Sequence, residues 1–240
     1  MRYLVRTKQK EKTTYTHAVR LRTTKTCLLL LSLTLSTATI EAQQASSLNK
    51  REFLDKLASA AVERTHHKVR YEPAYVALSY PGGDVPADTG VCTDEVVRSY
   101  RALGIDLQKE VHEDMLKNFA AYPSKWGRTR ADSNIDHRRV PNLQVFFSRK
   151  GESLAITDRA QDYSPGDVVT WDLGGGQTHI GIVVQDKAFF SRRHMIVHNI
   201  GEGPKIEDVL FSWKITGHYR YFGPVNLMPS HPASASQATP

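Results

Sequence analysis

One stretch, residues 80–103, constrains the fold of this chain more than any other, because turn-forming residues run directly into an amphipathic helix. Paired glycines, Gly82 and Gly83, lie in its first half. Its second half has apolar side chains at helical spacing, closed by Gly104: Val96, Val97, Tyr100 and Leu103. The spacing predicts a helix that begins near Cys92. Unpaired backbone N–H groups at a helix N-terminus lower the pKa of a nearby thiol, so we expect Cys92 to be reactive.

The basic charge of the chain is concentrated at its N-terminus. The 240 residues carry a formal net charge of +7. Residues 1–42 hold eight Lys/Arg and two acidic residues, so the rest of the chain has a net charge of only +1. Because a nucleic-acid-binding domain needs its own basic surface, the charge does not support a nucleic-acid partner, and we expect none.

The same 42 residues have the pattern of an export signal. A basic region precedes an apolar run from Cys27 to Ile40, and Ile40-Glu41-Ala42 is an acceptable cleavage site. We expect a signal peptide or, if it is retained, a short anchor that is the chain's one contact with a membrane. Residues 43–224 are then predicted to form one domain, located in the periplasm or cell envelope of a bacterium. Residues 225–240, rich in Ser, Ala and Pro, are predicted to be disordered.

Removal of the leader also removes Cys27, so that Cys92 becomes the lone cysteine of an exported protein. Such a cysteine is either a small buried hydrophobe or a chemically used thiol. The cysteine count leaves both interpretations open.

Helical patterns occupy most of the domain up to residue 151, and strand patterns follow. Helices are predicted over residues 48–61, 92–103, 107–119 and 141–150. Residues 120–142 are dense in charged and turn-forming residues, so we expect a long loop there. Strands are predicted over residues 168–171, 179–184, 195–200 and 217–222. This order predicts an α+β fold in which N-terminal helices pack on a small antiparallel β-sheet.

Thiol catalysis requires a base and a group that orients the base. Alternation along the predicted strand 179–184 places His179 and Gly181 on one face, where the glycine leaves room for the helix that carries Cys92. On the next strand, either His198 or Asn199 can face His179, and alternation does not decide between them. A single strand histidine is more often structural than catalytic. The three residue types together, in this order, predict a catalytic set.

A metal site is not predicted. The other histidines of the domain, among them His66, His67, His112, His194 and His218, lack a recognisable ligand spacing. Hydrolysis by a thiol, a base and an orienting group requires neither a metal ion nor an organic cofactor, so we expect none.

Several longer motifs resemble known bacterial families. The order Tyr80, Gly82-Gly83, Cys92, P-G-D-V-V-T-W, H-I-G-I-V-V and V-H-N is similar to the NlpC-type cell-wall peptidases, which are papain-like cysteine enzymes. A closer resemblance is to the family named domain of unknown function 1287, through G-V-C-T-D, N-I-D-H-R-R-V-P-N, G-D-V-V-T-W-D-L and I-T-G-H-Y-R-Y-F. It extends from about Leu48 to Phe222 and rests on several long motifs in the same order.

The resemblance implies a papain-like, NlpC-type domain with Cys92 as nucleophile, His179 as base and His198 as the third residue. It also implies that Tyr80 contacts the region of the cysteine. Two features depart from the peptidases: Val91-Cys92-Thr93 replaces their D-C-S, and the loop of residues 122–142 has no counterpart in the small enzymes.

The resulting hypothesis is an exported cysteine peptidase or amidase that cleaves an amide bond, in the peptide stems of peptidoglycan, through a thioester intermediate. The same residues could instead serve an acyl transfer or an amide outside the cell wall. A different class, a catalytically silent envelope-binding protein with the same fold, is also open. Because guanidinium groups bind carboxylates, substrate contacts are predicted in the long loop and beside it, at Asp136, Arg138, Arg139 and Trp171. A surface loop held by local ion pairs would explain the same charged residues equally well.

Overall fold

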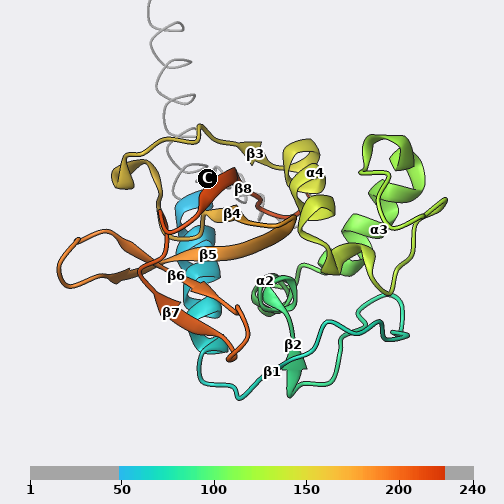
Figure 1. Cartoon of the computed structure of the whole chain (residues 1–240), viewed down its shortest axis with the longest axis horizontal. Helices are drawn as coiled ribbons and strands as arrows, with labels where there is room; N and C mark the ends of the chain where they lie inside the picture. The colour runs from blue at the N-terminus through green and yellow to red at the C-terminus, as the bar shows by residue number, and fades with distance from the viewer. Residues whose placement is uncertain (1–48, 225–240) are drawn as a thin grey trace, which may run out of the picture. The chain divides into compact units, whose positions relative to one another are not determined.

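The computed structural model describes residues 49–224 of the chain (Figure 1). The predictions for the leader and for the C-terminal tail lie outside the described residues. No helix within residues 49–224 is long and apolar enough to cross a membrane.

The four predicted helices are confirmed. They are a helix over residues 49–64, α2 (Cys92–Ala102), α3 (Leu107–Asn118) and α4 (Val140–Lys150). Short 3₁₀ helices follow or precede them: η1 (Phe119–Ala121), η2 (Asp136–Arg138) and η3 (Ala160–Asp162). The predicted long loop is therefore shortened at both ends by η1 and η2.

Six strands form one antiparallel sheet in the order β3-β8-β4-β5-β6-β7. They are β3 (Glu152–Ser153), β4 (Val168–Gly174), β5 (Gln177–Lys187), β6 (His194–His198), β7 (Lys205–Glu207) and β8 (Lys214–Arg220). A separate parallel pair joins β1 (Arg70–Tyr71) to β2 (Thr89–Gly90). The predicted strands correspond to β4, β5, β6 and β8, whereas elements of two or three residues are too short to show alternation. The predicted α+β class, with helices on an antiparallel sheet, is confirmed.

Local chemistry sets the ends of the helices. The Asp106 carboxylate caps α3, accepting hydrogen bonds from the backbone N–H groups of Gln108 at 3.1 Å and Lys109 at 3.3 Å. In α2, the Asp94 carboxylate accepts the backbone N–H of Val91 at 2.7 Å. Gly104 follows α2 with a φ of +81°, a conformation that favours glycine.

The sheet has an apolar core on each face. The helices pack on one face, against a cluster that includes Cys92 and these strand residues: Val168, Ile180, Ile182, Val184 and Val197. The other face carries a smaller cluster that is covered by loop segments: Tyr163, Val169, Trp171, Val183, Ile196 and Leu210. Alternation along β5 therefore separates two buried environments, which decides where each site residue points.

A buried ion cluster joins the beginning of β4 to the end of β8. The Asp167 carboxylate, fully buried, contacts His218 Nε2 at 2.7 Å and accepts a hydrogen bond from Arg220 Nε at 2.5 Å. The ring of Tyr163 stacks on His218 with centroids 4.3 Å apart. This cluster explains why the P-G-D and G-H-Y-R motifs occur together, since each supplies one half of it.

Replacement of Asp167 by Asn is expected to destabilise the domain by about 3 kcal/mol, because it leaves buried cationic and polar groups without their carboxylate. Urea unfolding measures the loss. Asp186→Asn on the exposed end of β5 is the matched control and is expected to change stability by less than about 0.5 kcal/mol. Equal stability of the two variants would contradict a structural role for Asp167.

Candidate functional site

Cys92 is the first residue of α2, as predicted. Its side chain is 5% exposed, and α2 packs against β5 (Figure 1). The backbone of Ile180 lies close enough to the sulfur to lower its pKa, as do the backbone groups of Thr93 and Cys92 itself. The thiol therefore lies beside the residue that follows His179.

The predicted lowering of the Cys92 pKa is wrong for this state of the protein. Burial, with a smaller contribution from the nearby Asp94 carboxylate, raises the pKa of the thiol to about 12. The backbone groups act in the opposite direction but are outweighed. The helix N-terminus is in place, yet the cost of burying a thiolate is larger than its stabilisation by the helix.

Three side chains form a continuous hydrogen-bonded chain across β5, β6 and β7. His179 Nε2 lies 2.8 Å from His198 Nδ1, and His198 Nε2 lies 2.8 Å from Glu207 Oε2. His198, rather than Asn199, therefore faces His179. Glu207 was not predicted, because β7 has only three residues and its pairing with β6 is a property of the sheet.

Two tryptophans enclose the histidines. The ring centroids of Trp171 and Trp213 each lie 5.9 Å from that of His179. Burial, together with a smaller effect of the neighbouring His198, lowers the pKa of His179 to about 3. Burial also lowers the pKa of His198, against the opposing effect of Glu207. Both rings are therefore neutral at pH 7.

Trp171 is not positioned to bind substrate. Its side chain is fully buried, and its Nε1–H donates to the Leu210 carbonyl at 2.9 Å. The earlier prediction of a substrate contact is corrected, since Trp171 forms the wall behind His179.

Cys92 and His179 approach β5 from different faces. The thiol belongs to the helix-side core with Ile180, whereas the His179 ring lies with Trp171 and Trp213. Within residues 49–224 the two side chains make no direct hydrogen bond, so their catalytic pairing stays a prediction. Gly181 does not make room for α2 as expected. A Cβ there would lie 2.6 Å from Ile196 Cγ2, so the glycine allows β6 to approach.

Arg138 anchors the start of α2 and is not available to a substrate. Its guanidinium binds both oxygens of Asp94, with Nε at 2.8 Å and Nη2 at 3.0 Å, and both side chains are almost completely buried. It also donates to the carbonyls of Ala74 at 3.0 Å and Glu72 at 3.1 Å. The predicted substrate contact of Arg138 is corrected, because its side chain is buried and makes four hydrogen bonds within the protein.

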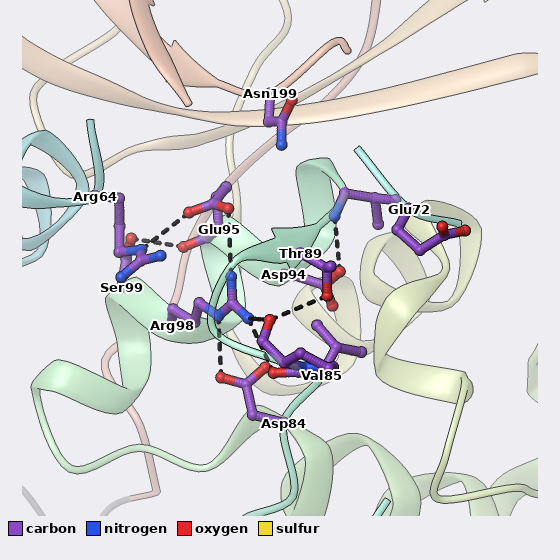
Figure 2. Close-up of polar contacts among 12 residues, drawn as sticks. Arg64, Glu72, Asp84, Val85, Thr89, Asp94, Glu95, Arg98, Ser99 and Asn199 are labelled. Carbon is purple, nitrogen blue, oxygen red and sulfur yellow. Dashed lines mark hydrogen bonds and ion pairs between the residues drawn. The ribbon is translucent and has the colours of Figure 1, made fainter. Parts of the chain in front are cut away.

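A second polar network holds the middle of α2 (Figure 2). Glu95 accepts from Arg64 Nε at 2.9 Å, and Arg98 Nε donates to Asp84 at 3.0 Å. The Asn199 side chain points from the sheet toward this network in Figure 2, and its Nδ2 has no partner among the described residues. Asn199 therefore faces α2 rather than His179, which agrees with its alternation relative to His198.

The remaining predicted residues lie apart from the histidines. The Tyr80 ring packs edge-on against the ring of His112 in α3, with the two centroids 5.0 Å apart. Its predicted contact with the cysteine region is therefore not seen. The tyrosine near the thiol is Tyr71, whose pKa is raised to about 12 by burial and then by Cys92. Asp136 is buried, which raises the pKa of its carboxyl group. The Arg139 guanidinium lies over the Trp126 ring, with Cζ 3.9 Å from the ring centroid.

Two of the histidines considered as metal ligands have other partners. His66 contacts Glu63 at 3.2 Å on the surface of the first helix. His218 belongs to the buried Asp167 cluster. No group of three or more His, Cys, Asp or Glu side chains is arranged for a metal ion in the part of the chain that the structure describes.

The chain matches a family model, a curated relative and a solved structure. The family described as "Domain of unknown function (DUF1287)" matches residues 58–221. "Uncharacterized protein YijF" of Escherichia coli (strain K12) is 52% identical over 166 residues, which cover 69% of this chain and 80% of that protein. The structure of NlpC1 from Trichomonas vaginalis matches with 15% identity and a TM-score of 0.39, over 70% of this chain and 44% of NlpC1. This chain thus spans less than half of NlpC1.

The low pKa of His179 makes stability depend on pH. Below its ordinary pKa of 6.5, the unfolded chain binds a proton at this position that the folded protein refuses until about pH 3. Folding stability is therefore lost as the pH falls, by up to about 1.4 kcal/mol per pH unit for this group. In urea unfolding between pH 7 and pH 5, His179→Gln is expected to lose about 1–2 kcal/mol less than wild type. Exposed His66→Gln should keep the wild-type slope, and an unchanged slope in His179→Gln would disprove the assignment.

Proposed function

Because the chain belongs to the family described as "Domain of unknown function (DUF1287)", and its motifs resemble NlpC-type peptidases, we propose that it is a cysteine hydrolase. Its substrate is an amide bond in the peptide stems of peptidoglycan. The observation that carries the proposal is the hydrogen-bonded chain of His179, His198 and Glu207 across β5, β6 and β7, which begins on the strand that packs against α2. Such a chain fixes one tautomer of the base, and thiol catalysis requires an orienting group of this kind.

The proton positions follow from the partners. The Glu207 carboxylate accepts, so His198 carries its proton on Nε2 and presents an unprotonated Nδ1. His198 Nδ1 then accepts from His179, which carries its proton on Nε2. Neutral His179 is left with a lone pair on Nδ1, the nitrogen that can take the thiol proton. Glu207 and His198 are positioning residues in this scheme, and Cys92 and His179 are the catalytic residues.

The two catalytic side chains lie on different faces of β5, so the proposed reaction requires a rearrangement that brings His179 to the thiol. In its first half, His179 Nδ1 then takes the Cys92 proton while sulfur attacks the amide carbon. Because burial keeps the thiol protonated at rest, proton transfer accompanies the attack instead of preceding it. The backbone N–H groups at the start of α2 stabilise the oxyanion. The C–N bond then breaks, the amine leaves with the proton from His179, and a thioester remains on Cys92.

In the second half, His179 takes a proton from water, whose oxygen attacks the thioester carbon. The C–S bond breaks, the new carboxylic acid is released, and the proton returns to sulfur. Export through the N-terminal leader would bring the protein to the cell wall. This location is part of the proposal, since residues 1–48 lie outside the described part of the chain.

A second candidate is a catalytically silent envelope-binding protein of the same fold. The observation that favours it is the thiol itself, which is 5% exposed and has a pKa raised to about 12. A thiol used only for packing would have these properties. Amide hydrolysis and thiol reactivity separate the two candidates.

The hydrolase proposal predicts that the wild-type protein digests purified peptidoglycan. Mass spectrometry of the released fragments measures this digestion. Cys92→Ala is expected to release none, because the nucleophile is absent. Glu207→Gln is expected to lower the rate by about 10- to 100-fold, because the amide no longer fixes the tautomer of His198. Glu202→Gln, an exposed residue before β7, is the matched control and should retain full activity. Identical fragments from wild type and Cys92→Ala would exclude the proposed function.

Alkylation of Cys92 by iodoacetamide at pH 7.5 tests the choice between the two candidates. In full-length protein with Cys27→Ser, a catalytic pair predicts labelling at least about tenfold faster than in the same protein with His179→Ala. A silent binding protein predicts equally slow labelling in both, as for a buried thiol without a base. Thermal unfolding shows whether the His179→Ala protein is folded.

A further inference from the structure

A pocket separate from the Cys92 and His179 residues lies between α3 and residues 126–134. Its volume is about 670 Å³, within the size range of small-molecule sites. The residues that matter for the following argument are aromatic or polar: Tyr75, His112, Trp126, Arg130, Asp132 and Asn134. The long loop that sequence analysis singled out therefore forms a cavity wall.

The loop that forms this wall is held by its own hydrogen bonds. The Asp132 carboxylate accepts from the Tyr75 hydroxyl at 3.2 Å and from the Asn134 backbone N–H at 3.0 Å, and it forms an ion pair with Arg128. Asn134 also accepts the backbone N–H of Leu78 at 2.7 Å, which ties the loop to the segment before Tyr80. The acidic charge in the pocket is thus neutralised internally, and the wall is fixed before any ligand arrives.

Trp126 presents an aromatic surface at the pocket. Its side chain is 52% exposed, although its backbone has a φ of +60°, which is uncommon for a bulky residue. The Arg139 guanidinium stacks over the ring at 3.9 Å and supports it from one side. An exposed indole held in an unfavourable backbone conformation is a feature of ligand-binding positions.

Two polar groups of the pocket have unused binding capacity. His112 Nδ1 is buried and has no hydrogen-bond partner among the described residues. Arg130 is exposed and forms no ion pair within residues 49–224. A buried ring nitrogen without a partner costs free energy that a ligand hydroxyl or amide could recover, and a guanidinium binds a carboxylate with two hydrogen bonds.

We propose that this pocket binds a carboxylate-bearing amino sugar. The flat face of the pyranose ring stacks on Trp126, the carboxylate binds Arg130, and a hydroxyl or acetamido group hydrogen-bonds His112. Binding here involves neither Cys92 nor His179, so the inference stands or falls separately from the hydrolase proposal.

The test is isothermal titration calorimetry of full-length protein with Cys92→Ala, which prevents turnover. The acidic probe is the disaccharide of N-acetylglucosamine and N-acetylmuramic acid with a free lactyl carboxylate, and the neutral probe is chitobiose. The acidic disaccharide is expected to bind at least about tenfold more tightly than chitobiose, because one charge-assisted contact is lost with the neutral sugar. Trp126→Ala should weaken both by about tenfold or more, whereas Arg130→Gln should remove the preference for the acidic probe.

The controls are Phe190→Ala and Arg192→Gln, an exposed aromatic and an exposed cation on the turn between β5 and β6. Both should bind the disaccharide like the parent protein. Absence of disaccharide binding, or binding unchanged by Trp126→Ala and Arg130→Gln, overturns the proposal. Binding of triglutamate with neither sugar bound would also overturn it, in favour of an acidic peptide.

Discussion

The structure around Cys92 depends on one buried ion pair, between Arg138 and Asp94. Asp94 sits in the first turn of α2 and also accepts the backbone N–H of Val91 just before Cys92. Arg138 comes from the far end of the long loop and also binds the carbonyls of residues 72 and 74. One guanidinium thus joins three segments at the N-terminus of the helix. A buried guanidinium is tolerated only when nearly all of its N–H donors are hydrogen-bonded, as those of Arg138 are.

The network of Glu95, Arg64, Arg98 and Asp84 continues this anchoring along α2 (Figure 2). It fixes the helix to the first helix and to the segment before β2. A nucleophile carried on this helix would have a well-defined position but little access to water. The raised pKa of the Cys92 thiol follows from the same burial that makes the helix rigid. Rigidity and a neutral thiol are therefore two results of one packing arrangement.

The two histidines lie in a different buried environment, on the other face of β5 from the thiol. Trp171 and Trp213 exclude water from His179 and His198, so both stay neutral, while Glu207 lies at the more exposed end of the chain of hydrogen bonds. A neutral base with a fixed tautomer suits proton transfer during attack and does not suit a resting thiolate–imidazolium pair. The strand β5 separates this environment from the thiol, and Ile180 is the residue at which the two meet.

The sequence alone determined the features that depend on neighbours within a few residues. These are the start of α2 at Cys92, the longer strands and the α+β class, because helix-boundary signals and periodicity act over one or two turns. Tertiary structure decided the rest. The register of β6 selected His198 over Asn199, pairing of β7 added Glu207, and burial reversed the expected shift of the thiol pKa. Arg138 was predicted to bind a ligand, but in the structure it binds Asp94, which lies 44 positions away in the sequence. Contacts between distant segments, and the exclusion of water that they produce, are not encoded in any local pattern.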